Sequence, residues 1–110
     1  MPRQSPTSTL FGRRLRAARN RAGVPQDKLG VMIGLDESSS SARISRYETG
    51  IHEPPFATAQ NLGQVLNVPA AYFYCEDDKL AELLIQYTRL DAKRRKQVLN
   101  LAAELHAELS

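Results

Sequence analysis

The 110-residue sequence predicts an all-α protein, on three observations. Apolar residues recur three or four positions apart through most of the chain, which is the period of a helix. Glycine, proline or a capping side chain interrupts this pattern every ten to fifteen residues, as expected where one helix ends and the next begins. No alternating strand pattern extends beyond a few residues.

The first two helices are predicted between Thr7 and Gly34. Thr7, Ser8 or Thr9 can cap the first helix, and Gly23 ends it because glycine readily adopts a positive φ. Its inward positions are expected to be Leu10 or Phe11, Leu15, Ala18 and Ala22. Pro25 suits the first turn of the second helix. The buried stripe expected there is Leu29, Met32 and Ile33.

A polar stretch over residues 36–41 precedes a third helix, which points Ile44 and Tyr47 inward and ends at Gly50. Pro54 and Pro55 open a fourth helix that ends at Asn67. Its expected inward residues are Phe56, Ala59, Leu62, Val65 and Leu66.

Three more helices are predicted in the remainder of the chain. Pro69 opens a short fifth helix over Ala70–Tyr74 with Phe73 in the core, and Asp77 or Asp78 caps a sixth that runs to about Tyr87. The seventh runs from about Asp91 to Glu108.

Charge is distributed unevenly along the chain. The net charge is only +3, yet residues 1–26 contain six arginines and no acid. Such a segment favours an anionic partner, which could be nucleic acid, a membrane surface or an acidic protein. No apolar run is long enough to cross a bilayer. The absence of a signal-like segment in residues 1–10 and the single cysteine, Cys75, lead us to expect a cytoplasmic location.

Catalytic and metal-binding patterns are absent from the sequence. His52 and His106 lie far apart, and Cys75 has no CxxC partner, so no zinc site is indicated. No glycine-rich phosphate loop or nucleophile elbow occurs. We therefore expect no enzymatic activity, no cofactor and no bound metal.

Ordered motifs between Phe11 and Tyr74 resemble the helix-turn-helix domain of the lambda-type repressor and Cro family, also called the XRE family. The resemblance rests on FGRRLRAARNRAGVPQDKLGVMIG, on ARISRYETG, and on the later Leu62, Leu66, Asn67 and Val68. It implies a five-helix lambda-repressor-like domain. The two amphipathic helices predicted after this domain lie outside the resemblance. The resemblance also implies binding to double-stranded DNA and a role as a transcriptional regulator, in the form of a repressor.

The resemblance assigns roles to individual residues. The base-contacting candidates on the third helix are Ser41, Ala42, Arg43, Ser45 and Arg46. The phosphate-contacting candidates are Gln26, Lys28, Ser39, Ser40, Arg14 and His52. Arg19 and Glu48 are expected to form an ion pair that ties the first helix to the third.

One spacing departs from the family pattern. Ten positions separate Gly34 from Ile44, where the family usually has six. Either the turn between the second and third helices is enlarged, or the third helix starts earlier with Asp36 or a serine as its cap. The four serines could form a flexible linker or offer hydroxyl groups to DNA. Asp36 and Glu37 are expected to turn away from phosphate.

The sequence suggests three segments: a disordered tail over residues 1–8, the helix-turn-helix domain over 9–75 and a helical extension over 76–110. The extension has two apolar stripes. They are formed by Leu80, Leu83, Leu84, Tyr87 and Leu90, and by Val98, Ala102, Leu105 and Leu109. These helices could fold back as a lid or pair with a second copy, and we expect a homodimer. The alternative is an antitoxin-type module that binds another protein and binds DNA secondarily; no small-molecule effector is indicated.

Overall fold

The computed structural model describes residues 6–110, and the helices in this part of the chain confirm the all-α prediction. Residues 1–5 of the predicted tail lie outside the described residues. The elements are α1 (Leu10–Ala22), α2 (Gln26–Met32), α3 (Glu37–Thr49), α4 (Phe56–Leu66), the 3-10 helix η1 (Ala70–Tyr74), α5 (Asp78–Thr88) and α6 (Ala92–Ala107). No helix of the described residues is long and apolar enough to span a membrane.

Four helices begin with a side-chain cap, and for all of them except α3 the sequence predicted the start closely. Thr9, Asp36, Asp77 and Asp91 each accept a hydrogen bond from a backbone N–H of the first turn of α1, α3, α5 and α6, respectively. Such caps satisfy donors that a helix leaves unpaired at its start.

The start of α3 answers the question raised by the long spacing before Ile44. Asp36 caps the helix by accepting from the Ser38 N–H at 3.2 Å, so the additional residues extend α3 instead of enlarging the turn. The serine segment is therefore helical, and the linker interpretation is wrong. Ser40 is fully buried and donates its hydroxyl hydrogen to the Asp27 carbonyl of α2.

The close approach of α2 and α3 depends on Gly30. A Cβ atom added at Gly30 would overlap the Ser40 side chain, so a larger residue there would force the two helices apart. The absence of a side chain at Gly30 thus allows the tight pairing of the two helices.

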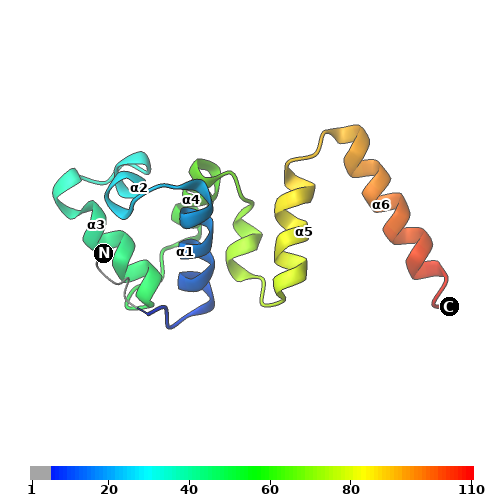
Figure 1. The fold of residues 1–110 in the computed structure, drawn as a ribbon, viewed down its shortest axis with the longest axis horizontal. Coiled ribbons are helices and arrows are strands. Elements are labelled where there is room, and N and C mark those ends of the chain that lie inside the picture. Colours follow the sequence, from blue (N-terminus) through cyan, green and yellow to red (C-terminus); the bar gives the residue numbers. More distant parts are fainter. Residues whose placement is uncertain (1–5) are drawn as a thin grey trace.

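The core lies between α1, α2, α3, α4 and η1, which gather at one end of the molecule (Figure 1), and it extends to Ala81 and Ile85 of α5. Its most buried large side chains include Leu15, Leu29, Ile44, Leu62 and Phe73. The inward orientation predicted for Ile44 and Tyr47 is confirmed.

Three predicted core positions are wrong. Met32 is 51% exposed, because α2 has only seven residues and its buried residues are Leu29 and Gly30. Phe56 is 58% exposed because it is the first residue of α4, where its ring lies 6.5 Å from that of Tyr74 instead of in the core. Ala22, at the last position of α1, is also exposed.

The C-terminal helices make the molecule elongated. α5 buries Ala81 and Ile85 and packs beside η1, whereas α6 extends away from the rest of the chain and has no buried residue (Figure 1). The radius of gyration is 16.1 Å, compared with the ~13 Å expected of a compact domain of this length. Within residues 6–110, this shape leaves α6 without a buried face.

Candidate nucleic-acid interface

α3 has one face in the core and one face in solvent. Its buried residues are Ser40, Ile44, Tyr47 and Glu48, which recur at helical spacing. On the opposite side, Ser38, Ser39, Ala42, Arg43 and Arg46 are exposed and Ser45 is half-buried. The outward face is therefore polar and cationic, with one small apolar side chain at its centre.

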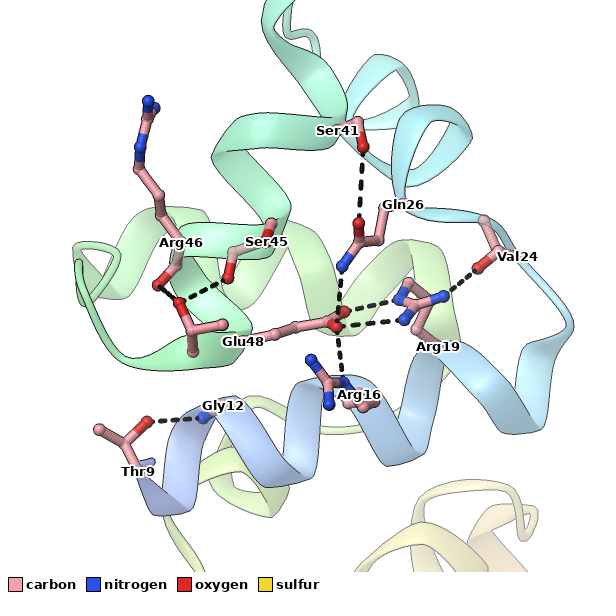
Figure 2. A network of polar contacts seen from close by, with 11 residues as sticks. Thr9, Gly12, Arg16, Arg19, Val24, Gln26, Ser41, Ser45, Arg46 and Glu48 are labelled. Carbon is pink, nitrogen blue, oxygen red and sulfur yellow. Dashed lines mark hydrogen bonds and ion pairs between the residues drawn. The ribbon is translucent and has the colours of Figure 1, made fainter. Parts of the chain in front are cut away.

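Arg43 and Arg46 supply the positive charge of this face. Across residues 6–110, neither guanidinium group makes a hydrogen bond or an ion pair. Figure 2 shows the Arg46 side chain extending away from the body of the protein. An arginine side chain in this position can form two hydrogen bonds with the O6 and N7 atoms of a guanine. Both cations are available to an external anionic partner.

The serines of α3 point in different directions, which corrects part of the sequence-based assignment. Ser40 is buried against α2 and cannot contact phosphate. Ser41 lies toward α2, where its hydroxyl group donates to Gln26 Oε1 at 3.5 Å, and it remains exposed (Figure 2). Ser39 is exposed and donates to the Asp36 carbonyl at 3.3 Å. Ser38, which was not among the candidates, is also exposed.

Ser38 was missed because the sequence left the start of α3 undecided. Once Asp36 is known to be the cap, helical spacing places Ser38 four residues before Ala42 and eight before Arg46, on the same face. The Asp36 cap was one of two alternatives in the sequence, so this signal was present but could not be used alone.

Gln26 is held at the start of α2 by contacts within the protein. Its Nε2 atom donates to Glu48 Oε1 at 3.1 Å, and its Oε1 atom accepts from Ser41 (Figure 2). One amide N–H is therefore used internally, and the side chain is oriented between α2 and α3. Contact of the remaining N–H with phosphate stays a prediction.

The Glu48 carboxylate is the centre of the polar network between α1, α2 and α3. It is completely buried and accepts hydrogen bonds from Arg19 Nε at 2.6 Å, from Arg19 NH2 at 3.1 Å and from Arg16 Nε at 2.9 Å, in addition to the Gln26 contact. The expected Arg19–Glu48 ion pair is present, and Arg16 joins it.

The charged network favours the ionised form of Glu48. Burial by itself raises the pKa of this carboxyl group, but the hydrogen bonds from Arg19 and Arg16 outweigh burial, so the pKa lies below its ordinary value of 4.5. The Glu48 anion thus neutralises buried guanidinium charge and fixes the angle between α1 and α3. This role is structural, and it places the outward face of α3.

Arg14 lies on another side of α1 and is not a phosphate contact, contrary to the expectation. Its side chain is buried, donates to the backbone carbonyls of Cys75 and Glu76, and pairs with Asp78 at 2.9 Å. Its guanidinium carbon also lies 5.6 Å from the centre of the Tyr72 ring. Arg14 therefore connects α1 to the segment between η1 and α5.

The two remaining phosphate candidates are on the surface. Lys28 is exposed on α2. His52 has an exposed side chain, but its backbone N–H donates to the Arg46 carbonyl at 3.2 Å and closes the end of α3. A phosphate contact through that N–H is therefore excluded, while a contact through the imidazole stays a prediction. In the part of the chain that the structure describes, no cluster of three potential metal ligands occurs.

Comparison with known proteins agrees with this architecture. Residues 10–72 match the family model described as a helix-turn-helix domain. Two curated HTH-type transcriptional regulators, from Sinorhizobium medicae and Rhizobium meliloti, are each 33% identical over 70 residues; the match covers 64% of this chain and 48% of each relative. The chain thus spans about half the length of these relatives.

Structural comparison extends the similarity to most of the molecule. The crystal structure of the transcriptional regulator BswR matches with a TM-score of 0.84 and 42% sequence identity, over 90% of this chain and 98% of that one. The matched family model covers more than half of the chain; it includes α1 to α4 and ends within η1. The resemblance seen in the sequence is confirmed: the chain belongs to the helix-turn-helix domain family of transcriptional regulators.

Proposed function

We propose that this protein is a sequence-specific, double-stranded-DNA-binding transcriptional regulator that represses transcription as a homodimer. The observation that carries the proposal is the outward face of α3, where Arg43 and Arg46 are exposed and have no hydrogen bond or ion pair with the residues that the structure describes. Similarity to proteins named as transcriptional regulators supports the same function. Occupancy of an operator requires no catalysed reaction.

In the proposed complex, α3 enters the major groove with this face toward the bases. Arg46 is the main candidate for a guanine contact, because it is exposed and Figure 2 shows its side chain pointing away from the polar network. The methyl group of Ala42 suits a thymine methyl, and the hydroxyl of Ser45 can pair with any base. Arg43 serves as a second base contact or binds the neighbouring phosphate.

Phosphate contacts set the position of α3 in the groove. Lys28, Ser39 and the free amide N–H of Gln26 are the candidates for this role. Gln26 Nε2 donates a hydrogen bond to Glu48 Oε1 at 3.1 Å. The position of α2 along the DNA backbone is therefore coupled to the orientation of α3. Ser41, hydrogen-bonded to Gln26, lies between the residues proposed to contact bases and those proposed to contact phosphates.

The homodimer proposal follows from the geometry of helix-turn-helix binding. Two half-sites one turn apart on DNA are separated by roughly 34 Å, which one domain cannot span with a single recognition helix. α5 and α6 lie outside the matched family segment and carry exposed leucines. We therefore assign residues 9–75 to DNA binding and residues 76–110 to self-association.

The proposal is tested by selecting bound duplexes from a random DNA pool with the wild-type protein, with Arg46→Ala and with Arg89→Ala. Arg89 is an exposed arginine on the C-terminal side of α5, remote from α3, and serves as the matched control. Wild type and the control should enrich the same motif, whereas Arg46→Ala should lose preference at one base pair by about 1–3 kcal/mol. Failure of the wild type to enrich any motif would overturn the sequence-specific function.

A further inference from the structure

α6 lacks the packing that normally stabilises a helix of its length. It has sixteen residues and none is buried; Leu99, Leu101, Leu105 and Leu109 are between 52% and 85% exposed. An isolated helix of about 15 residues is only marginally stable in water, because most helical stability in proteins comes from tertiary packing. The apolar side of α6 therefore needs a partner that the single chain does not supply.

The apolar residues of α6 form one stripe along its length. Val98, Ala102 and Leu105 recur at spacings of four and three, and Leu109, just beyond the end of α6, follows four residues later. Leu101 lies three residues after Val98 and four before Leu105. A stripe of this kind buries against another helix lying nearly parallel or antiparallel to it.

The charges on α6 oppose its own dipole. Its first turn carries Lys93 and Arg94, its last turn carries Glu104, and Glu108 is the residue at which it ends. Cations at a helix start and anions at its end are unfavourable for that helix. An antiparallel neighbouring helix reverses this disadvantage. The negative C-terminal end of its dipole lies beside the basic residues of the first helix, and its positive N-terminal end lies beside the acidic residues.

The charged residues also lie on the correct flank of the stripe for antiparallel pairing. Arg94, Gln97, Leu101, Glu104 and Glu108 alternate at spacings of three and four, so they line one flank. A two-fold axis perpendicular to two antiparallel helices places this flank against its own copy. Arg94, which forms an ion pair with the Asp91 cap of its own helix, then also faces Glu108 of the other chain. The opposite flank, at positions 95, 99, 102 and 106, carries no acid, so parallel pairing offers no such match.

Contacts of Arg95 hold the junction between α5 and α6, and the leucines of the apolar stripe are exposed. Arg95 donates from Nε to the Tyr87 carbonyl at 3.1 Å and from NH2 to the Thr88 carbonyl at 2.6 Å, and its guanidinium carbon lies 5.4 Å from the centre of the Tyr87 ring. Arg95 is therefore used within the chain, whereas Lys93 is exposed.

We propose that α6 docks antiparallel on α6 of a second copy of this chain, with the basic first turns of each helix beside the acidic last turns of the other. This inference rests on the homodimer part of the proposed function and defines its contact surface. The occupant is a second copy because α6 is complementary in charge to itself when the direction is reversed.

Charge reversal tests the complementarity in the full-length protein. A basic-end variant (Lys93→Glu with Arg94→Glu) and an acidic-end variant (Glu104→Lys with Glu108→Lys) should each self-associate at least tenfold more weakly in sedimentation equilibrium. An equal mixture of the two should restore a heterodimer. Lys96→Glu is the matched control, because Lys96 lies on the side of α6 opposite the apolar stripe and its change should leave the dimer intact. Equal dissociation constants for both variants and wild type would overturn the proposal.

Disulfide cross-linking tests the direction of the helices. In a Cys75→Ser background, Ala102→Cys lies beside the two-fold axis and should form a covalent dimer on oxidation, because the Cβ atoms of bonded cysteines lie only ~4 Å apart. Val98→Cys alone should not cross-link, but it should do so when mixed with Leu105→Cys. A covalent dimer from Val98→Cys alone indicates parallel helices and overturns the inference.

The outcomes separate this inference from the proposals on which it depends. A dimer that enriches a DNA motif but gives no Ala102→Cys cross-link refutes antiparallel pairing and leaves the proposed function intact. A protein that is monomeric at all concentrations, or that is found only in a complex with an unrelated protein, refutes the homodimer as well. Loss of motif enrichment with an intact cross-linked dimer refutes only the DNA-binding proposal.

Discussion

The buried carboxylate of Glu48 offers the sharpest prediction for stability. Replacing Glu48 by Gln removes the negative charge but keeps the size of the side chain. The three hydrogen bonds from Arg19 and Arg16 then lose a charged acceptor. The new amide group also places its N–H donors opposite the N–H donors of the two arginines. The Arg19 guanidinium group is left buried without a counterion.

The expected loss is large for a small domain. Breaking a buried ion pair from one side costs about 3–5 kcal/mol. Each kcal/mol corresponds to roughly 4–8 °C in a domain of about this size, so the Tm should fall by at least ~12 °C. Circular dichroism during thermal and urea unfolding measures both quantities.

A matched control is the ion pair between Arg21 and Glu82, which also joins α1 to another helix but has both side chains 45% exposed. Glu82→Gln should change the Tm only slightly, because solvent screens an exposed pair. An equally small effect of Glu48→Gln would refute the argument that the buried network orients α1 and α3.

The same residue predicts a dependence of stability on pH. The pKa of Glu48 is lower in the folded protein than its ordinary value of 4.5, so the unfolded chain binds the proton more readily. The stabilisation from Glu48 is therefore complete above about pH 5 and is lost as the pH falls through the folded-state pKa. Wild type should lose this stabilisation in acid, whereas Glu48→Gln should show a flatter profile in urea unfolding between pH 6 and pH 3. Profiles of equal slope would contradict a lowered pKa.

Other changes test the remaining structural assignments. Gly30→Ala should lower the free energy of unfolding by about 1–3 kcal/mol, as measured in urea, because its Cβ atom overlaps Ser40. Arg14→Ala should cost about 2–3 kcal/mol through its lost charged hydrogen bonds while leaving the salt dependence of DNA affinity unchanged. In contrast, Lys28→Ala should reduce the slope of log K against log salt by about 0.9, the value for one phosphate contact. An unchanged slope for Lys28→Ala would remove that residue from the interface.

The order and approximate bounds of the helices were predictable from the sequence because they depend on local chemistry. Thr9, Asp77 and Asp91 are capping side chains, Gly23 and Gly50 adopt positive φ values, and apolar residues recur with the helical period. Each of these signals acts within one turn of its helix. For the same reason, the inward orientation of Ile44 and Tyr47 could be deduced without the fold.

The roles of the arginines on α1 could not be separated by local chemistry. Arg14 and Arg19 are both buried, but Arg19 reaches Glu48 on α3 and Arg14 reaches the carbonyl groups before α5. The sequence contained an expectation for each of them: the Arg19–Glu48 pair is present, whereas the phosphate contact expected of Arg14 was wrong. The acceptor that each arginine contacts is decided by packing between segments that are 29 to 62 residues apart in the sequence.

Taken by itself, the sequence determined an all-α chain, the sites at which most of its helices begin and end, and the helix-turn-helix region. Only the tertiary structure decided that Asp36 caps an extended α3, that Ser40 turns into the protein while Ser38 faces solvent, and that α6 stands without a partner. The physical reason is the distance along the chain over which each kind of interaction acts. Caps and helical periodicity act over a few residues, whereas burial and charge neutralisation depend on which helices meet in space.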